Sequence, residues 1–283
     1  MNHLLAIRDL PAGQLRAILD LSRQPCSRIL EGKGVALYFE KPSARTRNSM
    51  ELAAAQLGGH PVYLQPTEIG ISTRESIADV ARTLACYHAI IAARVFDHQL
   101  LEELAAVGAA PVLNMLSGTD HPLQALADLL TIEQLLGRIA GARVAFLGEA
   151  NNVARSLGEA CALAGAEFTI ASPEGQGFAE PGEGVRQLVD PREAVEGADI
   201  VYTDVWVSMG GEDSAERRAL FEPYRVDEAL MARAPNAWFM HCLPARRGEE
   251  VEAQVIDGPR SAVWKQAQNR MHSARGAMLW MMQ

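Results

Sequence analysis

Short apolar runs alternate along the chain with longer segments whose apolar residues recur at helical spacing. In the first part of the chain, apolar runs predict strands at residues 34–39, 61–64, 89–93 and 110–115. Helical spacing predicts helices at residues 47–57, 76–87 and 100–107, and Asp9-Leu10-Pro11 begins an earlier one. Regular alternation of strand and helix is typical of a parallel α/β sheet.

A long helix, predicted at residues 120–136, separates this part from a second alternating set. The second set has predicted strands at residues 142–147, 167–171, 200–203 and 238–241, and a predicted helix at 152–164. A final helix is predicted at about residues 269–280. The pattern therefore indicates an α/β protein with two Rossmann-like domains, each with a parallel sheet flanked by helices, joined by the long helix.

Composition narrows the possible partners. The 283 residues include 26 Lys and Arg against 35 Asp and Glu, a formal net charge of −9. An acidic balance disfavours general binding to nucleic acid or to an anionic membrane, but a few local arginines can still build a pocket for a small anion. No apolar run approaches the ~20 residues of a membrane span, and the start lacks the order of a signal peptide.

The spacing of the cysteines predicts neither a disulfide framework nor a metal site. Cys26, Cys86, Cys161 and Cys242 are scattered without a CxxC pair, so neither a disulfide framework nor a zinc site is expected. Together with the absent signal peptide, this favours a cytoplasmic protein.

The loop that follows the first predicted strand has the composition of an anion site. It is Lys41-Pro42-Ser43-Ala44-Arg45-Thr46-Arg47, placed just before a helix. Backbone N–H groups at a helix start, two hydroxyls and two guanidiniums suit a phosphate group. The alternative is a helix cap with solvated arginines. The spacing GxxxxGK[ST] of a Walker loop is absent.

Two further loops carry cations or polar groups at strand ends. Arg94 follows an apolar strand and can point into the same cleft or lie on the surface. His121 and Gln124 come near the start of the long helix, about one turn apart, where they can polarise a carbonyl oxygen. The alternative for His121 is a structural capping role.

The second half has three such loops. Asp204 precedes Ser208-Met209-Gly210, where a carboxylate can hold an ammonium group or cap a helix. His241-Cys242-Leu243-Pro244 follows the last predicted strand, and its cysteine can equally be a small buried side chain. After the strand at 142–147, only Gly148 of a GxGxxG loop is present. A nicotinamide cofactor is therefore disfavoured, while Asn151 and Asn152 offer amide donors.

In this order, the loops resemble the aspartate/ornithine carbamoyltransferase family. Ser43-Ala44-Arg45-Thr46-Arg47 is similar to the family's phosphate loop, Ser-Thr-Arg-Thr-Arg. The other matching motifs are His121–Gln124 for His-Pro-x-Gln, Asp204–Gly210 for Asp-x-x-x-Ser-Met-Gly, His241–Pro244 for His-Cys-Leu-Pro, and Asn269–His272 for Asn-Arg-Met-His. The third and fourth motifs favour the ornithine branch over the aspartate branch.

The resemblance implies transfer of a carbamoyl group from carbamoyl phosphate to the side-chain amine of ornithine, without metal or cofactor. Residues 1–131, with a returning helix at 265–283, would bind carbamoyl phosphate, and 132–264 would bind ornithine. A homotrimer with active sites at subunit interfaces is also implied. The residues implied to bind carbamoyl phosphate are Ser43, Ala44, Arg45, Thr46, Arg94, His121, Gln124, Cys242, Leu243 and Arg270. Those implied to bind ornithine are Asn152, Asp204, Ser208 and Met209. The implied catalytic residues are Arg94, His121, Asp204 and Cys242.

Three departures from the family pattern keep the acceptor open. Ala44 replaces a threonine. Gly70 stands where a glutamine often reaches a neighbouring subunit; either Glu68 or Arg74 takes this role, or the contact is missing. Arg246 and Arg247 add unexpected positive charge. The alternatives are therefore a carbamoyltransferase for acylated ornithine or putrescine, a catalytically silent ligand-binding relative and, least favoured, a dehydrogenase.

Overall fold

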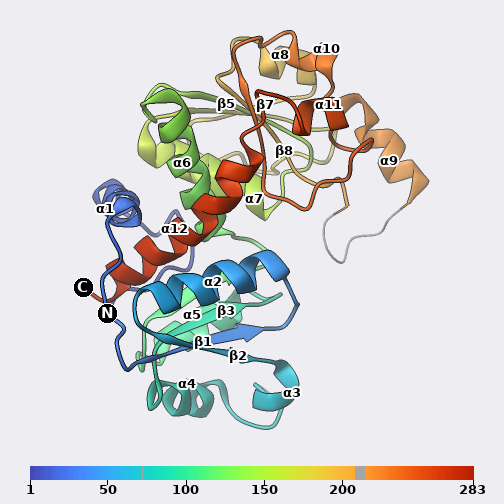
Figure 1. The fold of residues 1–283 in the computed structure, drawn as a ribbon. Coiled ribbons are helices and arrows are strands. Elements are labelled where there is room, and N and C mark those ends of the chain that lie inside the picture. The colour runs from blue at the N-terminus through green and yellow to red at the C-terminus, as the bar shows by residue number, and fades with distance from the viewer. Residues whose placement is uncertain (72, 208–213) are drawn as a thin grey trace. The chain divides into compact units, whose positions relative to one another are not determined.

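The computed structural model describes residues 1–71, 73–207 and 214–283. The chain forms two compact units, residues 1–127 with 269–283 and residues 128–268. The first unit holds a four-stranded sheet in the order β2-β1-β3-β4, and the second a five-stranded sheet in the order β7-β6-β5-β8-β9 (Figure 1). All neighbouring strands are parallel, which confirms the predicted α/β class with two parallel sheets. Within the described residues, no helix combines the length and apolarity of a membrane span.

The first unit is built around β1, whose sequence GVALYF is buried from Val35 onward. Its elements are α1 (Ala12–Arg23), β1 (Gly34–Phe39), α2 (Ala44–Gln56), β2 (His60–Leu64), α3 (Pro66–Ile69), α4 (Ile77–Ala85), β3 (His88–Arg94), α5 (Gln99–Ala106) and β4 (Val112–Leu116). Apolar residues of α4 and α5, such as Val80 and Leu101, pack with Tyr38 and Ala93 in one buried cluster. Figure 1 shows α2 on the opposite side of β1 from α4.

The second unit also has a parallel sheet with helices between its strands, and apart from α7 these helices are short. Its elements are β5 (Arg143–Leu147), α7 (Asn152–Ala164), β6 (Glu167–Ala171), β7 (Val185–Leu188), α8 (Pro191–Val195), β8 (Ile200–Thr203), α9 (Ala215–Phe221), the 3₁₀ turn Glu222–Tyr224, α10 (Glu228–Met231), β9 (Trp238–His241) and α11 (Ala253–Ile256). Leu147, Val201 and Phe239 from three neighbouring strands pack with Val255 of α11 in the buried core.

Two helices have residues in both units. They are α6 (Pro122–Leu136) and α12 (Val263–Met281). The C-terminal part of α12 belongs to the first unit, where Ser273 Oγ donates to the Leu123 carbonyl oxygen at 3.0 Å and Arg275 Nη2 to that of Ser22 at 2.9 Å. These bonds join the last helix to the start of α6 and the end of α1.

Several elements differ from the predictions, and two of these differences have a clear local cause. Helix α2 begins at Ala44, three residues before the predicted start, because Ser43 Oγ caps it by accepting from the Thr46 N–H at 3.4 Å. Strand β7 was not predicted, because Val185–Leu188 is an edge strand with exposed Arg186 and Gln187 and has no apolar run.

Candidate active site

Helix α2 presents its first turn at the carboxyl edge of the first sheet. Ser43 follows β1 closely, and its Oγ also donates to Thr46 Oγ1 at 3.2 Å. The cap fixes the loop so that the first-turn N–H groups at Ala44 and Arg45 point out of the helix start, as helix geometry requires. Such N–H groups, with the helix dipole, attract an anion. The predicted phosphate loop therefore has the local geometry of an anion site.

Arg94 comes to this loop from the neighbouring strand. It is the last residue of β3, it pairs in register with Phe39 of β1, and its Nη1 donates to Thr46 Oγ1 at 3.2 Å. The side chain is only 3% exposed, and its buried Nε has no hydrogen-bond partner among the described residues. Burial, and then the nearby positive charge of Arg45, lower the pKa of Arg94 to about 10. Arg94 thus remains cationic at neutral pH and has a donor available for a ligand.

His121 lies near Arg94 and Arg270 in the first unit. Burial lowers the pKa of His121 well below its usual value, and the charges of Arg270 and Arg94 lower it further. The imidazole is therefore neutral at pH 7 and keeps one N–H donor. Gln124, in the first turn of α6, is 3% exposed, and Arg270 of α12 is 6% exposed. These predicted residues are all buried in the unit that carries the Ser43 loop.

The buried neutral His121 predicts a change in the pH dependence of stability. In the unfolded chain His121 is protonated below about pH 6.5, whereas in the folded protein it stays neutral. The free energy of unfolding of the wild type therefore falls as the pH drops below 6.5. We expect His121→Gln to remove a contribution of up to about 1.4 kcal/mol per pH unit in that range. Urea unfolding between pH 5.5 and 7.5 measures it, with the exposed His60→Gln as the control. Parallel pH profiles for wild type and His121→Gln would contradict the neutral histidine.

The two exposed arginines of the loop have different surroundings. Arg47 Nε donates to Glu51 Oε1 at 2.7 Å, and its guanidinium lies 4.1 Å from the centre of the Tyr63 ring. Arg47 is thus held against its own surface, as the solvated-arginine alternative expects. Arg45 is exposed at the helix start and close enough to affect the pKa of Arg94. Of these two, Arg45 is the better placed to meet an anion.

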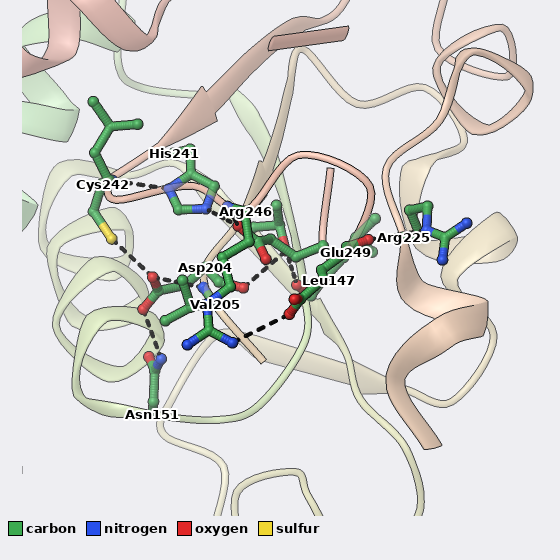
Figure 2. A network of polar contacts seen from close by, with 12 residues as sticks. Leu147, Asn151, Asp204, Val205, Arg225, His241, Cys242, Arg246 and Glu249 are labelled. Atoms are coloured by element: carbon green, nitrogen blue, oxygen red, sulfur yellow. Dashed lines mark hydrogen bonds and ion pairs between the residues drawn. The ribbon is translucent and has the colours of Figure 1, made fainter. Parts of the chain in front are cut away.

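The second unit gathers two polar side chains and one backbone N–H around Asp204. Its Oδ1 accepts from the Cys242 thiol at 3.1 Å and from the Val205 N–H at 2.8 Å (Figure 2). Its Oδ2 accepts from Asn151 Nδ2 at 2.9 Å. Asp204 and Cys242 follow the neighbouring strands β8 and β9, so the register of the sheet brings them together.

Asn151, one of the two amide donors that the sequence analysis named, contacts Asp204. Its Oδ1 caps α7 by accepting from the Val153 and Ala154 N–H groups, each at 3.0 Å, which aims Nδ2 at Asp204. Asn152 is the first residue of α7 and is half-buried. An Asn just before a predicted helix is also a cap signal, which agrees with the observed role of Asn151. Ser208 and Met209 lie outside the described residues.

The His241-Cys242-Leu243 loop is held by a buried dyad. His241 Nδ1 accepts from the Leu243 N–H at 2.8 Å, so the ring proton is on Nε2, which donates to Glu250 Oε1 at 3.2 Å. Leu243 has a φ of 60°, a conformation rare for residues other than glycine, and its N–H bond to His241 holds it there. His241 therefore has a structural role in the loop that carries Cys242.

Asp204, His241 and Cys242 also place potential metal ligands within 4.8 Å of one another. Both ring nitrogens of His241 are already bonded within the loop, and the Cys242 proton is directed at Asp204. The donor set is thus arranged as a hydrogen-bonded group, and the expectation of no metal stays a prediction.

The departures in the sequence have local explanations. Gly70 ends α3 with a φ of 66°, and a Cβ there would lie 2.9 Å from the Arg74 Cβ, so a longer side chain is strained at this position. Glu68 bonds the N–H of Gln65 at 2.6 Å at the start of its own helix. Arg74 Nη2 donates to the Glu68 carbonyl oxygen at 2.7 Å. Both side chains thus have roles within their own loop.

The unexpected arginines beyond Cys242 are paired with carboxylates. Arg246 Nη1 lies 3.3 Å from Glu249 Oε2 (Figure 2), and Arg247 Nη2 lies 2.7 Å from Asp257 Oδ1. These pairs account for the extra charge without an acidic group on the substrate.

Comparison with known proteins finds matches over nearly the whole chain. The family model described as aspartate/ornithine carbamoyltransferase, carbamoyl-P binding domain, matches residues 2–134, and the model of the Asp/Orn binding domain matches residues 140–281. The ornithine carbamoyltransferase of Hyperthermus butylicus is 48% identical, with 97% of this chain and 95% of that protein covered. The anabolic ornithine carbamoyltransferase of Pyrococcus furiosus is 44% identical, with 99% and 96% covered.

Solved structures give the same result. The ornithine carbamoyltransferase structure from Pyrococcus furiosus has a TM-score of 0.94 at 43% identity and covers 99% of this chain and 97% of that one. The structure from Thermus thermophilus has a TM-score of 0.91 at 42% identity, with 99% of each chain covered.

Proposed function

The chain belongs to the aspartate/ornithine carbamoyltransferase family, and we propose from its residues how it carries out the family reaction. The enzyme transfers the carbamoyl group of carbamoyl phosphate to the side-chain amine of L-ornithine, giving L-citrulline and phosphate, a step suited to arginine biosynthesis. The observation that carries this conclusion is the match of both domain models together with relatives at 44–48% identity over nearly the full chain. The first domain binds carbamoyl phosphate and the second binds ornithine, with the division at residues 1–131 plus 265–283 and 132–264.

In the proposed mechanism, the Ser43 loop takes the phosphate. Ser43, Arg45, Thr46 and the N–H of Ala44 supply donors to a dianion at the start of α2. As the amine attacks, charge builds on the carbamoyl oxygen. Arg94, Thr46 and the neutral His121 donate to that oxygen, Gln124 orients the carbamoyl NH₂ group, and Arg270 and the Leu243 backbone complete the site. Donors fixed before the reaction stabilise this charge without reorganisation.

The second unit fixes the amine. Asp204 holds the amino-acid end of ornithine by its carboxylate, with Asn152, Ser208 and Met209, and Cys242 lies beside the reacting amine. The C–N bond forms as the C–O bond to phosphate breaks. The ammonium group loses two protons, one to the departing phosphate and one to solvent. Positioning contributes most of the rate, since aligned reactants alone supply ~7–11 kcal/mol.

An acceptor panel tests this function. Formation of the carbamoylated amine, which is citrulline only when ornithine is the acceptor, is measured with carbamoyl phosphate and ornithine, acetylornithine or putrescine. We expect ornithine to be preferred, because Asp204 suits a free α-amino group and both nearby arginines are already paired with carboxylates. Preference for another amine would contradict ornithine as the proposed acceptor. No turnover with any amine would contradict the proposed enzymatic activity.

Two variants of Asn151 separate its effect on stability from its effect on ornithine binding. Asn151→Ala removes the cap of α7 and the bond to Asp204, so it should cost about 1 kcal/mol of stability and raise the KM for ornithine several-fold. Asn151→Ser keeps a capping oxygen but loses the bond to Asp204. It should retain stability and still raise that KM. Steady-state kinetics and thermal unfolding of both variants check this; a wild-type KM in Asn151→Ser would rule out the binding effect.

We also propose an oligomeric state for the enzyme. We expect a homotrimer with active sites at subunit interfaces, so light scattering should give about three times the 30.7 kDa chain mass. A monomer mass would contradict it.

We expect the enzyme to work in the cytoplasm, in keeping with four cysteines that all lie in the described part and form no disulfide.

A further inference from the structure

Three buried polar side chains form a closed hydrogen-bond network in the second unit. Gln266 Nε2 donates to Asp128 Oδ1 at 2.7 Å and to the Tyr202 hydroxyl oxygen at 2.9 Å. The Tyr202 hydroxyl in turn donates to Asp128 Oδ2 at 3.2 Å. The three residues are at most 1% exposed. A buried carboxylate is tolerated only when its oxygens are bonded, and here both oxygens of Asp128 accept from the other two residues.

The remaining polar atom of Gln266 reaches the loop of Cys242. Gln266 Oε1 accepts from the His241 N–H at 2.9 Å, at the end of β9 and directly before Cys242. The orientation of the amide is determined, because Asp128 offers only acceptors and the His241 N–H only a donor. One side chain thus ties the backbone of β9 to a residue of α6 and a residue of β8.

The network also adjoins the ornithine residues. Burial raises the pKa of Tyr202 well above its usual value, and the nearby Asp128, Cys242 and Asp204 raise it further. The phenol therefore keeps its proton and acts as a donor to Asp128. Tyr202 is two residues before Asp204 and His241 directly precedes Cys242, so the network lies close to the carboxylate that is proposed to hold ornithine and to the thiol beside the reacting amine.

We propose that Gln266 is a positioning residue for the ornithine site, acting through Asp128, Tyr202 and the His241 backbone. It fixes the backbone before Cys242, so that the thiol stays directed at Asp204 and beside the reacting amine. This inference rests on the proposed function for its kinetic consequences, but the geometry of the thiol can be tested without turnover.

The kinetic test compares Gln266→Leu with Gln268→Leu, the same exchange at an exposed position of the same helix. Gln266→Leu should raise the KM for ornithine or lower kcat by at least about tenfold. Inhibition by inorganic phosphate, which reports the Ser43 loop alone, should stay within twofold. Gln268→Leu should match wild type in both. If Gln266→Leu does not fold, Tyr202→Phe removes one hydroxyl of the network and should change the same constants in the same direction by a few-fold.

The second readout is the alkylation of Cys242 by iodoacetamide, followed peptide by peptide. A thiol that donates to a carboxylate keeps its proton, and the thiolate is the reactive form. Cys242 should therefore react several-fold faster in Gln266→Leu, while the exposed Cys26 and Cys86 provide internal references. Lower stability with unchanged ornithine kinetics and unchanged Cys242 alkylation would overturn the inference. Absence of citrulline from wild type would instead refute the proposed function, and the alkylation comparison would still test the network.

Discussion

Replacing Arg94 with methionine is expected to lower kcat/KM for carbamoyl phosphate by about 10²–10³. Methionine fills a similar buried volume, so the loss should come from the guanidinium. Arg94 is 3% exposed and bonds Thr46 Oγ1, and its pKa of about 10 keeps it charged at neutral pH. Its buried position means that water cannot replace the lost charge. Steady-state kinetics with carbamoyl phosphate varied at saturating ornithine measure the effect.

Arg47→Met is the matched control for Arg94→Met. Arg47 lies in the first turn of α2, next to Thr46, which Arg94 contacts, but its guanidinium bonds Glu51 and lies over Tyr63. Its loss should change kcat/KM by no more than a few-fold. Equal losses in both variants would indicate a general electrostatic effect, and near-wild-type kinetics in Arg94→Met would contradict its place in the site.

Replacing Asp204 with asparagine is expected to raise the KM for ornithine by about 10² or more, with little change in the KM for carbamoyl phosphate. The exchange preserves shape but removes the charge that is proposed to hold an ammonium group. If the oxygen of the new amide stays with its two donors, Cys242 and the Val205 N–H, its NH₂ group faces Asn151 Nδ2, which is also a donor. Asn151 cannot turn its amide to compensate without losing the cap of α7.

A second Asp to Asn exchange controls for this change. Asp227 caps α10 by accepting from the Leu230 N–H at 2.7 Å, and asparagine caps equally well, so Asp227→Asn should leave both KM values unchanged. Equal increases of both KM values in Asp204→Asn would contradict its assignment to ornithine.

Most strands were predicted from the sequence because they consist mainly of apolar residues. Strands β1, β6, β8 and β9 and helix α7 have the predicted bounds. Strand β7 was missed because Val185–Leu188 is a short, exposed edge strand. The short helices α8, α10 and α11 have too few turns to show a period.

The site was predictable at the level of loops but not of individual bonds. Strand-end loops predicted Ser43, Arg94, Asp204 and Cys242 as site candidates, because parallel strands bring their carboxyl ends to one edge, and the roles of these residues stay predictions. Spacing could not show that Asn151 bonds Asp204, or that Arg47 turns away to Glu51. Gln266 carried no local signal at all, since its partners are distant in sequence.

The most direct test of carbamoyl transfer follows the carbon itself. Carbamoyl phosphate labelled with ¹³C is incubated with the enzyme and ornithine, and the labelled carbon is followed by NMR while phosphate is measured in parallel. We predict that the label appears in the ureido group of citrulline, with one phosphate released per citrulline, and that Arg94→Met slows both together. Label found only in the products of spontaneous carbamoyl phosphate breakdown, at the rate seen without enzyme, would contradict the account.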